Sequence, residues 1–114
     1  MNIALATDFE RRLQQRVNER LSDTLVDDYR RDGAIVIRQL LTPDELALLS
    51  DGIEANLAQP SPRAKVASRP DDPGRFIEDF CNWQHNDAYR EVIFGSSLAA
   101  AAGLLTGSRS IWLY

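Results

Sequence analysis

Apolar side chains recur at the spacing of an amphipathic helix in two stretches near the start of the chain. The first predicted helix has Asp8 in position to cap it. Its apolar stripe consists of Phe9, Leu13, Val17 and Leu21. The second runs from about Asp23 to Asp32, with Leu25 and Tyr29 on one face. Gly33 follows it, where a left-handed C-cap residue is preferred.

The stretch LLTPDELALLSDGIEANLAQP predicts the best-defined helix of the chain. Thr42 as N-cap, Pro43 in the first helical position and Glu45 three residues after the cap form a capping box. The apolar stripe of this helix consists of Leu46, Leu49, Ile53 and Leu57. Pro60 ends it. We expect the stripe to be buried against a strand at Ala34–Arg38.

Three stretches have the β-branched or alternating pattern that is typical of strands. They are AIVIR at 34–38, RFIEDFCNW at 75–83 and SIWLY at 110–114. Between the last two, Asn86 or Asp87 can cap a helix that runs through Phe94. Ser96 or Ser97 can cap a further helix, SLAAAAGLLTG, which ends at Gly107.

Residues 59–74 contain four prolines and little apolar surface. Such a segment cannot offset the entropy of ordering itself, so we expect an exposed loop. The loop is either a connector or a segment that flanks a substrate, and the sequence leaves both open. The remaining pattern is continuous, so we expect residues 1–114 to form a single domain.

Charge and composition exclude some partners and compartments. With 13 basic and 17 acidic residues the net charge is −4, and no basic run is long enough to follow a phosphate backbone. We therefore expect no nucleic-acid partner. No apolar run reaches the length of a membrane span, and the N-terminal sequence lacks a secretory pattern, which predicts a cytoplasmic protein without membrane contact. Cys81 is the only cysteine and is expected to be a small buried hydrophobe.

The tripeptide His85-Asn86-Asp87 has the His-x-Asp spacing found in iron sites with two histidines and one carboxylate. His85 is the only histidine of the chain, so this sequence cannot supply the second imidazole. Two groups alone bind iron weakly, and Asp87 is better explained as a helix cap. We interpret the tripeptide as structural and expect neither a metal ligand nor a catalytic residue in this chain. Glu78 and Asp79 could be general acid or base groups, but we expect them on a solvated strand face or paired with Arg75.

Two longer stretches carry a family resemblance. YRRDGAIVIRQLLTPDELALLSDGI resembles the opening of the phytanoyl-CoA dioxygenase family, in which an Asp-Gly turn leads to a strand and a capped helix. GRFIEDFCNWQHNDAYREVIFGSSLAAAAGLLTGSRSIWLY is similar to the segment before the catalytic strand in that family. The resemblance covers residues 29–114 apart from the proline-rich loop.

The resemblance implies an α+β fold, namely the N-terminal helices and first strands of a double-stranded β-helix, the jelly roll. It also implies a parent enzyme that uses iron(II) and 2-oxoglutarate to hydroxylate a small-molecule substrate. In that family the His-x-Asp pair lies beyond the strand that SIWLY would begin. The chain is therefore expected to end before the metal-binding strands, with neither cofactor bound to it.

Three aromatic residues are the expected substrate contacts in the parent enzyme. Phe80, Trp83 and Trp112 lie on segments that would line the mouth of the barrel. The alternative function is a stand-alone α+β binding or interaction module without catalysis. In either case we expect strand edges to be exposed, and self-association to occur through them.

Overall fold

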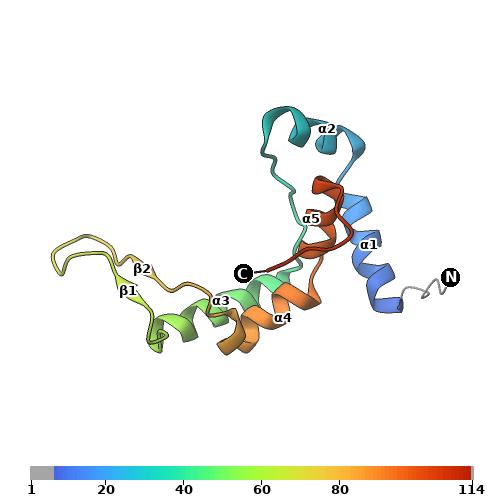
Figure 1. Cartoon of the computed structure of the whole chain (residues 1–114). Helices are drawn as coiled ribbons and strands as arrows, with labels where there is room; N and C mark the ends of the chain where they lie inside the picture. Colours follow the sequence, from blue (N-terminus) through green and yellow to red (C-terminus); the bar gives the residue numbers. More distant parts are fainter. Residues whose placement is uncertain (1–6, 114) are drawn as a thin grey trace.

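The computed structural model describes residues 7–113, and these are mainly helical (Figure 1). In chain order the elements are α1 (Asp8–Arg20), α2 (Asp23–Asp32), α3 (Pro43–Ala58), β1 (Lys65–Val66), β2 (Ile77–Glu78), the 3-10 helix η1 (Trp83–His85), α4 (Asp87–Gly95) and α5 (Leu98–Thr106). The one sheet among the described residues is the antiparallel hairpin of β1 and β2, in which Lys65 pairs with Glu78 and Val66 with Ile77.

The α+β prediction, with the first strands of a double-stranded β-helix, is wrong for this structure. Residues 34–37 and 110–113 have no regular secondary structure, and the stretch 75–83 is a strand only at Ile77–Glu78. Tyr114, the last residue of the third predicted strand, lies outside the described residues. β-Branched and aromatic side chains favour strands only where a neighbouring strand pairs with them. Among the described residues, no strand lies beside 34–37 or 110–113 to pair with them.

Most helix boundaries follow the predicted caps. The Thr42 hydroxyl accepts a hydrogen bond from the Glu45 backbone N–H, and the Glu45 carboxylate accepts one from the Thr42 N–H. Gly33 takes the left-handed conformation that ends α2, and Asn86 caps α4. The prediction that Asp8 caps α1 is wrong, because Thr7 and Glu10 form a capping box that places Asp8 inside the first turn.

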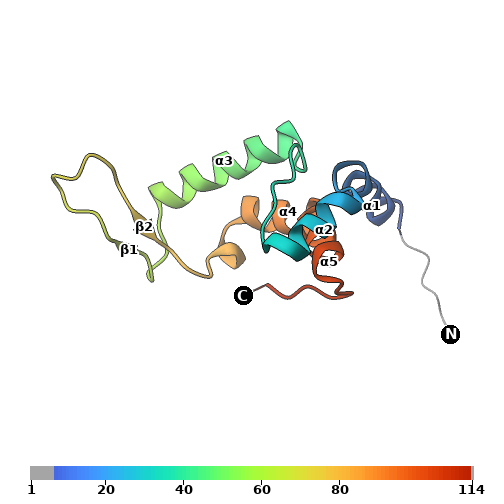
Figure 2. The ribbon, with the colours of Figure 1, turned by 90° about the horizontal axis from the view of Figure 1, so that it is seen from above.

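Two groups of helices form the body of the protein. Helices α1, α2 and α5 pack together at one end, while α3 and α4 run antiparallel beside them (Figures 1 and 2). The main core lies within the first group and consists of Val17, Leu21, Val26, Leu40 and Ala101. Two arginines of α1 attach the chain between α2 and α3 to this group. Arg16 donates hydrogen bonds to the Leu40 and Gln39 carbonyl oxygens, and Arg20 donates one to the Gln39 side chain.

Helix α3 does not bury the face that its apolar pattern predicts. Leu46, Ile53 and Leu57 are exposed, and Gly52 is the buried residue of the helix. A side-chain carbon added at Gly52 would lie 2.9 Å from the Ala88 Cβ of α4. The close approach of α4 to this glycine therefore determines which face of α3 is covered. The predicted strand at 34–38, which would have covered the leucine stripe, does not form.

The chain is unusually open for its size. Its radius of gyration is 17.2 Å and its accessible surface is 9122 Å². A compact domain of this length has a radius of gyration of about 13 Å, and a compact 12.8 kDa protein exposes roughly 6,300 Å². Several large apolar side chains are exposed, among them Val36, Phe76, Phe80 and Trp112.

Candidate functional site

A groove of about 440 Å³ lies where α3 meets η1 and the start of α4. Its walls come from the second half of α3, the residues that follow it, and residues 82–88. Most of the lining side chains are amides, hydroxyls and carboxylates. The lining includes Asp51, Asn56, Ser61, Asn82, His85 and Asn86. The β1–β2 hairpin leaves and re-enters the body beside this groove (Figure 1).

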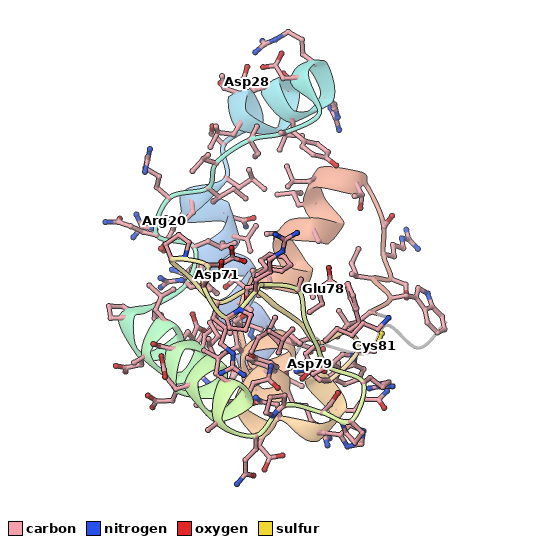
Figure 3. All side chains as sticks on the ribbon, turned by 90° about the vertical axis from the view of Figure 1, so that its left-hand side faces the viewer. Arg20, Asp28, Asp71, Glu78, Asp79 and Cys81 are labelled. Atoms are coloured by element: carbon pink, nitrogen blue, oxygen red, sulfur yellow. The ribbon has the colours of Figure 1, made fainter. Side chains whose placement is uncertain are left out.

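Asp79 closes the base of the hairpin. Its carboxylate accepts hydrogen bonds from the Ser61 backbone N–H at 2.9 Å and from the Ser61 hydroxyl at 2.5 Å. These bonds join residues 18 positions apart in sequence and hold the two ends of the hairpin segment together. Of the alternatives for Asp79, pairing with Arg75 is wrong, because the carboxylate bonds to Ser61 instead. Figure 3 shows Glu78, Asp79 and Cys81 where the hairpin returns to the helices.

A second hydrogen bond joins the two ends of the hairpin segment two residues further along. The Arg63 guanidinium donates a hydrogen bond of 2.9 Å to the Cys81 carbonyl oxygen. Cys81 has a positive φ of 56°, a conformation that few residues other than glycine adopt. Its side chain is exposed, so the prediction of a buried cysteine is wrong. The chain makes a turn at this residue.

Three asparagines join α3 to the segment that leads into α4. The Asn82 side-chain amide donates a hydrogen bond of 2.8 Å to the Asn56 side-chain oxygen. The Asn86 amide donates one of 2.9 Å to the Gly52 carbonyl oxygen, and its own oxygen accepts from the Tyr89 N–H. No buried side-chain polar atom among the described residues lacks a partner. Asp79, Ser61, Asn56, Asn82 and Asn86 therefore form a hydrogen-bonded polar cluster beside the groove, which we call the joint.

Electrostatics in the joint favour a charged Asp79. The hydrogen bonds from the Ser61 side chain and backbone lower the pKa of Asp79, against a smaller opposing effect of burial, and Asn82 and Asn56 lower it further. Burial, together with the negative charge of Asp79, raises the pKa of Tyr89. A general base works best with a pKa near the operating pH. A carboxylate with a lowered pKa is a weak base, so Asp79 is suited to holding Ser61 in place rather than activating it.

The tripeptide His85-Asn86-Asp87 does not have the arrangement of an iron site. His85 ends η1, Asn86 uses its side chain to cap α4, and Asp87 occupies the first turn of that helix. Within residues 7–113 no group of three or more histidine, cysteine, aspartate or glutamate side chains could hold a metal ion. The residues present do not fit the iron centre that the family resemblance implies.

The predicted substrate contacts lie in different surroundings. Trp83 is half-buried in η1, and its ring meets that of Phe94 edge-on with 5.5 Å between centroids. Phe80 is 71% exposed and Trp112 is 83% exposed. Trp83 and Trp112 are separated by α4 and α5 in the chain. The geometry does not test whether these three residues contact a substrate, so that role stays a prediction.

Sequence reasoning missed the residues that build the joint. Ser61, Asn56 and Asn82 are short polar residues without a distinctive spacing, so no sequence signal identifies their partners. Gly52 did carry a signal, because an isolated glycine inside a helical pattern often marks a close contact. Its importance follows only from the position of α4.

Comparison with known proteins gives no relative for this chain. No protein-family model, curated protein or solved structure matches it. In the part of the chain that the structure describes, no helix is long and apolar enough to cross a membrane.

Proposed function

We propose that this chain is the N-terminal helical part of a non-haem iron(II)/2-oxoglutarate-dependent dioxygenase that hydroxylates a small molecule. Its role there is to support and partly cover the catalytic portion, and it provides no metal ligand. The sequence resemblance over residues 29–114 suggests the enzyme class. The structural observation in favour of an auxiliary role is the large accessible surface of the chain, on which several large apolar side chains are exposed.

The size of the total accessible surface is the main support for the proposal. The accessible area of 9122 Å² exceeds that of a compact protein of this mass by roughly 2,800 Å². A typical stable interface buries about 800 Å² on each partner. The surface is therefore large enough to be covered by a whole further domain rather than by one small contact.

The location of the exposed residues suggests where the catalytic portion would pack. Val36 lies on the extended segment between α2 and α3, and Ile111, Trp112 and Leu113 lie on the extended segment after α5. Isolated apolar residues on a surface are ordinary, and we infer that the catalytic portion would cover these two extended segments because neither has a strand partner among residues 7–113. Phe80 and Trp112 would contact either substrate or the catalytic portion.

The chemistry of the reaction would come from iron(II) and 2-oxoglutarate bound by residues outside this chain. Asp79, Ser61 and the three asparagines keep α3, α4 and the hairpin in fixed positions relative to one another. Their contribution is to position Phe80, which follows Asp79 in the chain. No proton transfer is assigned to them.

The test is a polypeptide that extends this chain along its natural reading frame to the next stop codon. We expect it to contain a His-x-Asp pair and a distal histidine, and to bind manganese(II), a redox-silent substitute for iron, in the presence of 2-oxoglutarate. With iron(II) and oxygen it should decarboxylate 2-oxoglutarate. The matched control is His85→Ala, which should leave manganese binding unchanged.

Two results would contradict the proposal. One is a stop codon directly after Tyr114, which would favour a non-catalytic interaction module. The other is an extended polypeptide that binds neither manganese(II) nor 2-oxoglutarate. Loss of manganese binding in His85→Ala would instead show that His85 is a ligand and that our structural interpretation of it is wrong.

A further inference from the structure

The outer face of α3 carries a regular apolar seam. Positions 46, 50, 53 and 57 follow the alternating spacing of four and three residues that is typical of a coiled-coil contact. Leu46, Ile53 and Leu57 are 52%, 44% and 39% exposed, and Ser50 occupies the fourth position. At 1.5 Å per residue the seam is about 17 Å long. Figure 2 shows α3 along one edge of the molecule, with α4 on its inner side.

The same helix is strongly acidic. It contains four acidic residues and no basic residue. Glu45 belongs to the capping box. Asp44, Asp51 and Glu54 are exposed, and within residues 7–113 the salt bridges involve α1 and α2 only. Glu54 directly follows Ile53, at a position that flanks the seam. Its carboxylate would face the flank of any helix packed there.

We propose that this seam, defined as positions 46, 50, 53 and 57, is a docking site for a basic amphipathic helix of a partner protein. An apolar stripe of two heptads selects a helix with leucine-like residues at matching spacing. The Glu54 carboxylate at the flank of the seam selects lysine or arginine on the facing edge of that helix, because opposite charges across an interface favour the correct partner and like charges disfavour others.

The acidic charge of α3 also affects pairing with a second copy of this chain. Two α3 helices packed seam to seam would bring two acidic helices together without any basic residue on either one. The like charges oppose this arrangement. A foreign basic helix removes the conflict and covers the same leucine and isoleucine side chains. This inference does not depend on the proposed dioxygenase function.

The direct test is fluorescence anisotropy with a designed helical peptide of about three heptads, with leucine at the core positions and lysine at the flanking positions. We expect saturable binding to this chain that weakens as salt is added. Ile53→Asp should abolish binding while leaving the far-UV circular-dichroism spectrum unchanged, because Ile53 is partly exposed. Val66→Asp is the matched control, since Val66 is an exposed aliphatic residue on the hairpin and its substitution should not affect binding.

Two further variants distinguish specific docking from non-specific apolar binding. Ser50→Leu fills the polar position of the seam and should tighten binding about tenfold, as expected for burying one more leucine side chain. Glu54→Lys should reverse the charge preference. A peptide with glutamate at its flanking positions should then bind better than the lysine peptide, by up to about fivefold for each exposed ion pair.

Several results would overturn the proposal. Val66→Asp weakening binding as much as Ile53→Asp would show non-specific apolar contact. Light scattering that shows a dimer dissociated by Ile53→Asp would assign the seam to a second copy. A polypeptide extended along the natural reading frame that no longer binds the lysine peptide would show that the same chain covers the seam.

Discussion

Helix α4 packs directly against Gly52 of α3, so Gly52→Ala is a sharp test of the fold. In the middle of a helix, alanine is favoured over glycine by about 1 kcal/mol. The tertiary structure opposes this gain. The added Cβ would lie 2.9 Å from the Ala88 Cβ and 3.1 Å from two ring carbons of Tyr89, whereas carbon atoms are comfortable at about 3.5–4.0 Å.

The steric effect should exceed the helix-propensity effect. The Tyr89 ring can rotate away, but the Ala88 Cβ is fixed to the backbone of α4, so the helices must separate. Separation also lengthens the 2.9 Å hydrogen bond from Asn86 to the Gly52 carbonyl. Overpacking of this kind costs about 1–3 kcal/mol. After the gain in propensity, we expect Gly52→Ala to lower the free energy of unfolding by about 1–2 kcal/mol.

Two further variants make the prediction decisive. Gly95 is the last residue of α4, and a side-chain carbon there would meet no atom within 4 Å, so Gly95→Ala should be neutral or stabilising by up to about 1 kcal/mol. Ala88→Gly, combined with Gly52→Ala, removes the shortest contact. The double-mutant cycle should therefore show a favourable coupling of about 1 kcal/mol.

Urea denaturation followed by far-UV circular dichroism measures these free energies. If Gly52→Ala stabilises the chain as much as Gly95→Ala, α3 and α4 do not pack as described. The absence of coupling between Gly52→Ala and Ala88→Gly would lead to the same conclusion.

The remaining predictions concern caps and charge. Thr42→Ala should cost about 1 kcal/mol in a thermal melt through loss of the N-cap, whereas Thr42→Ser should retain most of the stability. Gly33→Ala, at a φ of 79°, should cost roughly 1 kcal/mol because residues with a Cβ disfavour that conformation; an unchanged urea midpoint would contradict the assigned cap. Since the pKa of Asp79 is lowered on folding, its contribution to stability is present above the ordinary aspartate pKa and is lost as pH falls through the folded pKa. Asp79→Asn should reduce that acid dependence, and Ser61→Ala should raise the Asp79 pKa towards its ordinary value in a carboxyl NMR titration; equal pKa values in Ser61→Ala and the parent chain would rule out the link.

The sequence by itself determined the local features. The capping box at Thr42, the end of α2 at Gly33 and the helix from Asp87 depend on hydrogen bonds and backbone conformations within a few residues. Such contacts form wherever the helix forms, so local residue types were enough to predict them. The cap of α1 was misplaced by one residue because Thr7 and Asp8 are both good cap residues.

Tertiary structure decided which faces are buried and which extended runs become strands. The stretch AIVIR has a strand-type composition, yet a strand needs a partner, and none lies beside it in residues 7–113. The leucine stripe of α3 is apolar enough for a core, but the approach of α4 at Gly52 covers a different face. The joint of Asp79, Ser61 and the asparagines connects positions 18 to 34 residues apart. Pairings over that distance depend on how the chain packs, and the periodicity of one segment carries no information about them.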